Sequence, residues 1–177
     1  MDIATMVITF AKEVPEALWK VLWVLGMLIG TLYCGNALLR MSRASRLPGQ
    51  SPVTMGEILP IMIVGGLLYN LSSFIDATWN SMGTGVVTYG PVTYATGKDF
   101  GKFADAINAV LTIASVAGGC YFFKGVVLLK RATSDGQSSG GSEDYVWRAI
   151  THMIGGSLMV QVADTIERFR QSLHLFW

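Results

Sequence analysis

Charged side chains are scarce in this sequence of 177 residues. Asp, Glu, Lys and Arg together make up 14% of the chain, whereas soluble domains carry about 25%. Hydrophobic residues make up 51%, and the mean hydropathy is +0.46. The formal net charge of +1 predicts no bulk attraction to nucleic acid. The length suits one domain, and the composition argues against an ordinary soluble globule.

Residues with reactive side chains are also few. Two cysteines, Cys34 and Cys120, are too few for a disulfide framework, and two histidines, His152 and His174, leave little material for a metal site. The sequence contains no CxxC pair, no HExxH motif and no phosphate-binding loop ending in GKS or GKT. We therefore expect no catalytic residues, no metal, no cofactor and no enzymatic activity. For His152, a hydrogen bond between helices is the ordinary role and an intramembrane functional group the alternative.

Four uncharged stretches run through the chain. They cover 21–39, 58–75, 106–123 and 149–163, with lengths of 19, 18, 18 and 15 residues. A helix needs about 20 largely apolar residues to cross the hydrocarbon core, with a range of about 17–25. We therefore expect an all-α integral membrane protein with about four hydrophobic helices, arranged as two tandem helical hairpins. The fourth run is also short enough for a buried or re-entrant helix, and a soluble all-helical core is the alternative for the whole chain.

The segments between these runs complete the expected organisation. Val-Thr-Tyr triplets on both sides of Gly90-Pro91 predict a short extended or β-like loop over 79–97, serving as a cap or as a partner-binding edge. The expected order is an amphipathic N-terminal lead-in over 1–20, a first helical hairpin over 21–76, an extracytoplasmic loop over 77–104, a third membrane helix over 105–131, a flexible polar linker over 132–144 and a C-terminal helix over 145–177.

Basic residues gather after the first and third uncharged runs. The sequence has Arg40, Arg43, Arg46, Lys130 and Arg131 at these two places. Because cytoplasmic loops are enriched in Lys and Arg, we expect both turns on the cytoplasmic side. The same clusters would also bind phosphate groups, either of anionic lipids or of single-stranded DNA in transit. From the sequence, these clusters could act either as a topology signal or as a phosphate-facing surface.

Glycines occupy the middles of the uncharged runs. Gly costs about 1 kcal/mol relative to Ala inside a helix, so glycines placed there indicate close helix contacts or kinks. An offset of 90 residues also aligns Gly65-Gly66 with Gly155-Gly156 and Arg40 with Lys130, and duplication and chance both explain the match. Contacts within one subunit and contacts between subunits are both compatible with the glycines. The predicted packing positions are Gly26, Gly30, Gly65, Gly66, Gly118, Gly119, Gly155 and Gly156.

Two stretches of the sequence resemble a known family. They are GEILP at 56–60 leading through GGLLY at 65–69 to FID at 74–76, and THMIGGSL at 151–158. Both are similar to the IcmC/DotE group of small membrane proteins from Dot/Icm type IVB secretion systems, whose counterpart in I-type conjugative plasmids is TraQ. The length and the order of the hydrophobic runs match this group over most of the chain.

The resemblance implies a component of a bacterial envelope apparatus that moves protein or DNA, located in the inner membrane and without catalytic residues. Each half of the chain is also similar to conjugative pilins, in which a short basic turn joins two apolar helices beside bound phospholipid. We therefore expect a pilin-like structural subunit that assembles with itself and with phospholipid into a conjugative pilus or conduit, next to other type IVB secretion components. An extracellular pilus would be its assembled location. The alternatives are a fixed inner-membrane component that forms no filament, and a small channel or transporter.

Overall fold

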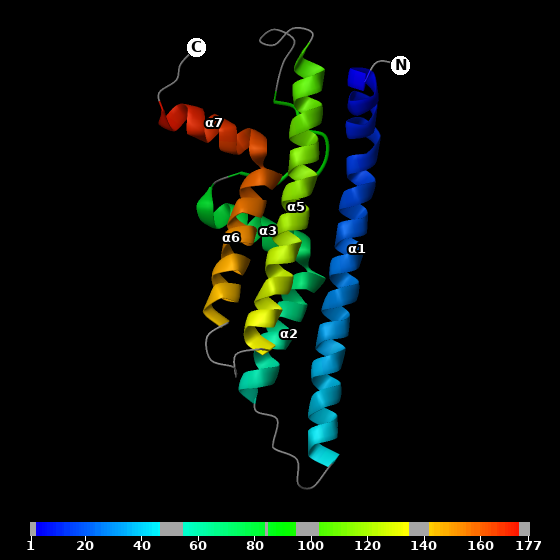
Figure 1. Ribbon diagram of the computed structural model, residues 1–177, viewed down its shortest axis with the longest axis vertical. Helices are drawn as coiled ribbons and strands as arrows, with labels where there is room; N and C mark the ends of the chain where they lie inside the picture. The colour runs from blue at the N-terminus through cyan, green and yellow to red at the C-terminus, as the bar shows by residue number, and fades with distance from the viewer. Residues whose placement is uncertain (1–2, 47–54, 84, 95–102, 135–141, 174–177) are drawn as a thin grey trace.

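A computed structural model describes residues 3–46, 55–83, 85–94, 103–134 and 142–173 (Figure 1). All regular secondary structure in these residues is helical, which confirms the all-α class for the described part of the chain. The helices are α1 (Ile3–Arg46), α2 (Met55–Tyr69), α3 (Leu71–Met82), α5 (Ala104–Ser134), α6 (Ser142–Val160) and α7 (Val162–Ser172).

Helix α1 is a single helix of 44 residues that extends along the whole bundle (Figure 1). Pro15 lies inside it and is buried. The first turns of α1 pack along α5, since Ile8 and Ala11 line a small cavity together with Thr112. The lead-in predicted over 1–20 is therefore not a separate element from Ile3 onward, because the helix continues without a break into the first uncharged run.

The second uncharged run is broken in its middle. Asn70 has the non-helical angles φ −114° and ψ 56°, and α3 leaves it at 93° to α2. Three large side chains on one face of α3, Leu71, Ile75 and Trp79, are buried, because positions i, i+4 and i+8 lie on the same side of a helix. This face packs across the bundle. Helices α1 and α2 form a hairpin, but residues 71–76, expected to continue its second helix, turn away (Figure 1).

The C-terminal half has a similar layout. Helix α5 packs against α6 as α1 packs against α2, and Gln161 then interrupts the chain with φ −105° and ψ 49°, close to the angles of Asn70. The C-terminal helix expected over 145–177 thus begins at Ser142 and is divided at Gln161. The first and last residues of the linker expected over 132–144 are helical, because α5 continues to Ser134 and α6 begins at Ser142. Residues 135–141 lie outside the described ranges.

Helices α1 and α5 run in one direction, and α2 and α6 run in the other (Figure 1). All of them contribute to one buried core with α3. It contains Trp19 and Leu22 of α1, Val64 and Leu68 of α2, Leu71 and Ile75 of α3, Val116, Phe122 and Val126 of α5, and Val160 of α6. The C-terminal ends of α1 and α5 therefore lie at the same end of the molecule.

The loop expected over 79–97 is not confirmed as β-like in the described residues. Its first residues, Trp79–Met82, belong to α3, and 85–94 form an extended segment without a strand; residues 95–97 lie outside the described ranges. The physical reason is that side chains of α5 bind the backbone of this segment. Thr112 Oγ1 accepts a hydrogen bond from the amide of Val92 at 2.8 Å, and Asn108 Oδ1 accepts one from the amide of Tyr94 at 3.0 Å. The two amides are thus not used for pairing with a second strand.

Candidate functional site

Helices α1 and α2 cross at glycines. An ideal Cβ placed on Gly30 would lie 2.5 Å from the carbonyl oxygen of Gly65 and 2.7 Å from the amide nitrogen of Tyr69. A Cβ on Gly26 would lie 2.7 Å from the carbonyl oxygen of Leu68. Real side chains do not fit at such distances, so the glycines allow the two backbones to touch.

Helices α5 and α6 cross in the same way. A Cβ on Gly118 would lie 2.8 Å from the carbonyl oxygen of Gly156, and a Cβ on Gly156 would lie 2.6 Å from the amide nitrogen of Phe122. Beside this crossing, Ser115 Oγ donates a 2.8 Å hydrogen bond to the carbonyl oxygen of Val160. Each hairpin therefore has a glycine contact near the middle of its helices.

Gly119 joins the two hairpins. A Cβ at this position would lie 2.5 Å from the ring of Trp19, so the indole of α1 packs directly onto the backbone of α5. Gly66 and Gly155 differ from the other predicted packing positions, because no atom lies within 4 Å of their Cβ positions. Among the described residues these two glycines make no close contact with another helix, so their Cβ positions are open.

The predicted basic residues lie toward the C-terminal ends of α1 and α5, which run in the same direction, although α1 extends beyond α5 (Figure 1). Arg40, Arg43 and Arg131 are exposed. Arg46 is the last residue of α1, and the position of its side chain lies outside the described structure. All five residues were predicted in loops, but the structure places Arg40, Arg43 and Arg46 in α1 and Lys130 and Arg131 in α5, because both helices continue beyond their uncharged runs.

Lys130 and Arg40 do not lie at the same depth, although the offset of 90 aligns them. The Nζ atom of Lys130 lies 5.4 Å from the centroid of the Tyr33 ring, a distance typical of a cation–π contact. Tyr33 precedes Arg40 by two helical turns, or about 10 Å along α1. Helix α1 therefore extends beyond the end of α5, and the basic surface is stepped rather than level.

Tyr89 holds the extended segment 85–94 against α1 and α3, a role that the sequence does not suggest. Its ring packs edge-on against Trp19 and Trp23, with centroids 4.9 Å and 5.4 Å away. Its hydroxyl donates to Asp76 Oδ1 at 2.7 Å and lies 3.1 Å from the carbonyl oxygen of Ser72. Burial, then the hydrogen bond to Asp76 and the negative charge of this carboxylate, raise the pKa of the Tyr89 phenol above its ordinary value.

Helix α7 completes a cap on the bundle, on the side away from the C-terminal end of α1 (Figure 1). The guanidinium carbon of Arg168 lies 5.5 Å from the centroid of the Trp79 ring, and Gln161 Nε2 donates to the carbonyl oxygen of Val86 at 3.3 Å. The cap therefore contains three segments that are distant in the sequence: α3, residues 85–94 and α7.

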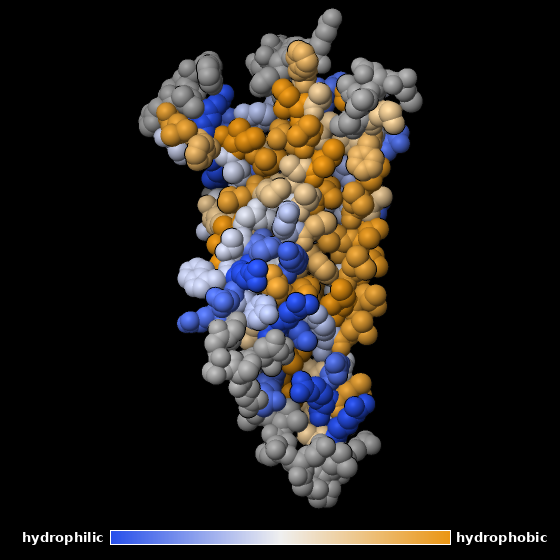
Figure 2. Space-filling view, in the orientation of Figure 1, coloured by the Kyte–Doolittle hydropathy of each residue, from blue (hydrophilic) through white to orange (hydrophobic). Residues whose placement is uncertain are grey.

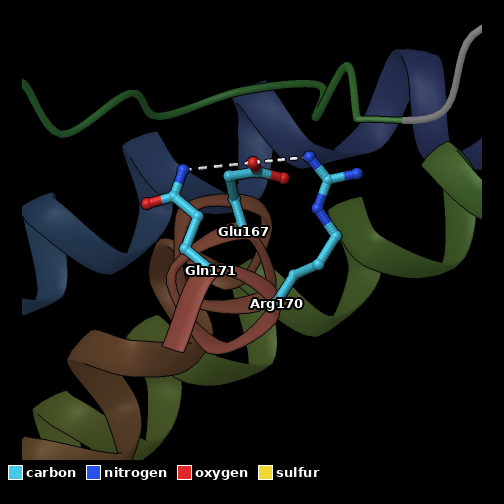
Figure 3. A network of polar contacts seen from close by, with 3 residues as sticks. All are labelled: Glu167, Arg170 and Gln171. Atoms are coloured by element: carbon cyan, nitrogen blue, oxygen red, sulfur yellow. Dashed lines mark hydrogen bonds and ion pairs between the residues drawn. The ribbon is translucent and has the colours of Figure 1, made fainter. Parts of the chain in front are cut away.

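A polar network on α7 is local to that helix. Glu167 accepts hydrogen bonds from Arg170 at 2.8 Å and from Gln171 at 3.2 Å (Figure 3). The partners lie three and four residues from Glu167, and exposed pairs at this spacing stabilise a helix by about 0.2–0.5 kcal/mol each. The network supports α7 and is no candidate for a binding site.

Two cations lie at an unexpected depth. Gly119 packs on Trp19, and α5 runs in the same direction as α1 with the same rise per residue, so Lys124 lies level with about Val24, inside the uncharged run of α1. Arg148 is at a similar level, because the carbonyl oxygen of the next residue, Ala149, lies 2.9 Å from the Cβ position of Gly125. Both cationic side chains are exposed.

A cation at the centre of a lipid-facing helix costs about 2.5–3.5 kcal/mol on insertion scales. Figure 2 shows hydrophilic residues over the lower parts of α5 and α6, beside a hydrophobic column over α1. In the sequence, Lys124 and Arg148 only mark the ends of two uncharged runs. Their depth relative to α1 depends on how α5 and α6 pack against it.

His152 lies one turn beyond Arg148 on α6. Its Nδ1 atom is 2.7 Å from the carbonyl oxygen of Arg148, and its ring packs at 5.9 Å against Tyr121 of α5. This bond lies within its own helix, and the ring contact is the connection to the neighbouring helix. In the described part of the chain, no group of three or more His, Cys, Asp or Glu side chains is arranged to hold a metal ion.

Two helices are long and apolar enough to cross a membrane: α1 over Ile8–Ala44 and α5 over Ala104–Ala132. Helices α2 and α3 would add a third crossing only as one span bent by 93°. Helix α6, which covers the fourth uncharged run, does not qualify among the described residues, since its window includes Glu143, Asp144 and Arg148. The fold thus defines an all-helical membrane protein with two or three candidate spans where the sequence predicts about four. No family model, curated protein or solved structure matches the chain.

Proposed function

We propose that this chain is a pilin-like structural subunit of a bacterial type IVB secretion or conjugation apparatus. It assembles with itself, and with phospholipid, into a conduit for DNA or protein, starting from the inner membrane. The sequence resemblance to the IcmC/DotE group supports the apparatus. One structural observation supports the pilin-like part: in both glycine-crossed hairpins the first helix carries basic residues toward its C-terminal end, and these two helices run in the same direction (Figure 1).

Phospholipid is the expected partner of this basic end. Many copies of Arg40 and Arg43 brought together in an assembly would repel one another unless anions lie between them. A phosphate headgroup supplies the anion, and its acyl chains suit the exposed apolar side chains above, such as Leu38 and Leu39. The arginines would then act in assembly as well as in topology.

The experiment replaces Arg40, Arg43 and Arg46 together by Gln and measures the phospholipid in purified assemblies by mass spectrometry. We expect less retained phospholipid per subunit and lower transfer efficiency, with the helical circular dichroism spectrum unchanged. A control replaces Lys12 and Lys20, exposed cations in the N-terminal half of α1, by Gln and leaves lipid content unchanged. Lipid-free wild-type assemblies, or equal lipid content in the triple variant, would contradict the lipid part of the proposal.

A second candidate function is a fixed inner-membrane component that forms no filament. The cap favours it, because contacts such as Tyr89 with Asp76 and Arg168 with Trp79 build a folded end that a plain two-helix hairpin lacks. Electron microscopy of purified assemblies separates the two candidates. Helical filaments support the pilin-like subunit, and rings with a fixed number of copies support the membrane component.

A further inference from the structure

Helix α7 turns an apolar side away from the rest of the protein. Ile166, Phe169 and Leu173 are spaced by three and four residues, so they lie on one side of the helix and form an apolar stripe. Their side chains are exposed by 37%, 66% and 54%, and no residue of α7 is buried. On a surface helix in water, the apolar side ordinarily faces the core. The stripe on α7 does not.

Polar side chains attach α7 to its neighbours instead. The guanidinium carbon of Arg168 lies 5.5 Å from the centroid of the Trp79 ring of α3. Thr165 Oγ1 donates a 2.9 Å hydrogen bond to the carbonyl oxygen of Leu158 on α6. The side of α7 that contacts the protein is thus polar, and the side that is left uncovered is apolar. This is the reverse of what water on the uncovered side would favour.

The beginning of α7 lies beside uncharged parts of the chain. Ser115 Oγ of α5 donates a 2.8 Å hydrogen bond to the carbonyl oxygen of Val160, two residues before α7 begins. Ser115 belongs to the uncharged run 106–123, and the run 149–163 of α6 ends inside the first turn of α7. A membrane that covers these two runs therefore reaches the level of α7.

The direction of α7 suits a membrane surface. Helices α1, α2, α5 and α6 follow the long axis of the molecule, whereas α7 lies across it (Figure 1). A helix that lies across membrane-crossing helices is roughly parallel to the membrane plane. Amphipathic helices in this position bury their apolar side about 5–10 Å into the boundary between headgroups and acyl chains.

A second copy of the chain is a poorer cover for the stripe. A large aromatic side chain buries about 150–250 Å² when it is fully covered, so three apolar side chains provide at most several hundred Å². A stable protein interface buries about 800 Å² on each partner. Lipid needs no such minimum area, because it surrounds the protein at this level.

We infer that α7 is an interfacial helix whose stripe of Ile166, Phe169 and Leu173 inserts among lipid acyl chains. Its polar side stays on the cap and toward water, where Glu167 holds its local network (Figure 3). The inference goes beyond the proposed function, because it concerns one copy of the chain and does not require self-assembly. This lipid contact is also separate from the basic residues near the end of α1.

The test places one nitroxide label at a time on α7 in vesicles of phosphatidylethanolamine and phosphatidylglycerol. In a chain with Cys34→Ser and Cys120→Ser, Phe169→Cys carries the label on the stripe. Gln171→Cys is the matched control, because it places the same label on the opposite side of the same helix. Electron paramagnetic resonance measures collisions of the label with oxygen, which concentrates in hydrocarbon, and with a nickel chelate that stays in water. We expect the ratio of oxygen to nickel collisions to be several-fold higher at position 169 than at position 171.

Three results would overturn the inference. Equal ratios at the two positions, or frequent nickel collisions at position 169, would place the stripe in water. Few collisions with either reagent at position 169 would place it in a contact with protein. Leu173→Cys repeats the measurement with Phe169 in place, so a label that disturbs the helix at position 169 does not decide the outcome. None of these results depends on filaments or rings, which the electron microscopy of assemblies tests separately.

Discussion

Gly30 of α1 and Gly65 of α2 face each other so closely that neither position has space for a Cβ atom. A methyl group on Gly30 would lie 2.5 Å from the carbonyl oxygen of Gly65, which is rigid backbone. We therefore expect Gly30→Ala to force the helices apart and to lower the free energy of unfolding by about 1–3 kcal/mol. Denaturant titration in detergent, followed by tryptophan fluorescence, measures the change.

Gly66→Ala is the control for this substitution. Gly66 lies next to the contact glycine, but its Cβ position is open, so Ala should leave the monomer as stable or raise its stability by up to about 1 kcal/mol through helix propensity. If Gly66→Ala destabilises the monomer as much as Gly30→Ala, the contact between α1 and α2 is not at Gly30 and Gly65 as assigned. Normal monomer stability with failed assembly would instead place Gly66 in a contact between subunits.

The adjacent glycines of α6 provide a second matched pair. Gly156 lies at the crossing with α5, where a Cβ would be 2.6 Å from the amide nitrogen of Phe122, whereas the Cβ position of Gly155 is open. We expect Gly156→Ala to destabilise the folded protein by about 1–3 kcal/mol and Gly155→Ala to have little effect. Thermal unfolding in detergent, followed by circular dichroism, measures the difference between the two variants. Equal unfolding midpoints would contradict the assignment of Gly156, rather than Gly155, to the contact with α5.

The hydrogen bond from Tyr89 to Asp76 predicts a dependence of stability on alkaline pH. The pKa of the Tyr89 phenol is raised in the folded protein, by burial first and then by Asp76. Below about pH 10 both states hold the proton, so the contribution of this group is fully present. Above that pH the unfolded chain releases its proton before the folded protein does. The free energy of unfolding must then fall with rising pH, by at most about 1.4 kcal/mol per pH unit for this one group.

Tyr89→Phe tests this directly. The variant should be less stable than the wild type at neutral pH by about 1–2 kcal/mol, because the Asp76 carboxylate loses a donor in a half-buried site. It should also lose the part of the alkaline decline that Tyr89 causes. Denaturant titrations at neutral pH and above about pH 10 provide both quantities. Parallel curves for the two proteins over the whole range would show that the Tyr89 phenol is not linked to folding.

The helical class and the candidate spans in α1 and α5 could be predicted from the sequence, because the length of an uncharged run is a local property. The bend at Asn70 could not. Leu71 and Ile75 continue the apolar pattern of the run, and the sequence does not indicate that α3 buries them by turning across the bundle. Adjacent glycines raise the same difficulty: Gly65 and Gly66 differ by about 100° around the helix, and the pattern does not identify which one faces α1.

The cap and the depth of Lys124 depend on longer-range arrangements. Tyr89 meets Asp76 because Trp19 and Trp23 pack against its ring, while Thr112 and Asn108 of α5 bind the backbone amides of the extended segment. Likewise, Lys124 lies level with the uncharged run of α1 because α5 packs with its own uncharged run displaced along α1. Charge counting along the chain detects neither displacement nor contact, since both arise from side-chain packing between distant segments.

The last prediction concerns the orientation of the molecule before assembly. The basic ends of α1 and α5 lie at one end of the bundle, and the cap with residues 85–94 lies farther along it toward the other end (Figure 1). Because Lys and Arg favour the cytoplasmic side, Arg43 should be cytoplasmic and Val86 should face outward. Val86 is 86% exposed, which makes it a good position for a reporter thiol. In a chain with both native cysteines replaced by Ser, Val86→Cys should react with an impermeant maleimide in intact cells.

Arg43→Cys should react in the same cells only after the inner membrane is permeabilised. The Arg43→Cys substitution removes one positive charge, but Arg40, Arg46, Lys130 and Arg131 remain to favour a cytoplasmic position for this part of the chain. Reaction of Arg43→Cys in intact cells together with protection of Val86→Cys would invert the orientation. Reaction at both positions would mean that water reaches both ends of the bundle from one side, which contradicts the spans assigned to α1 and α5.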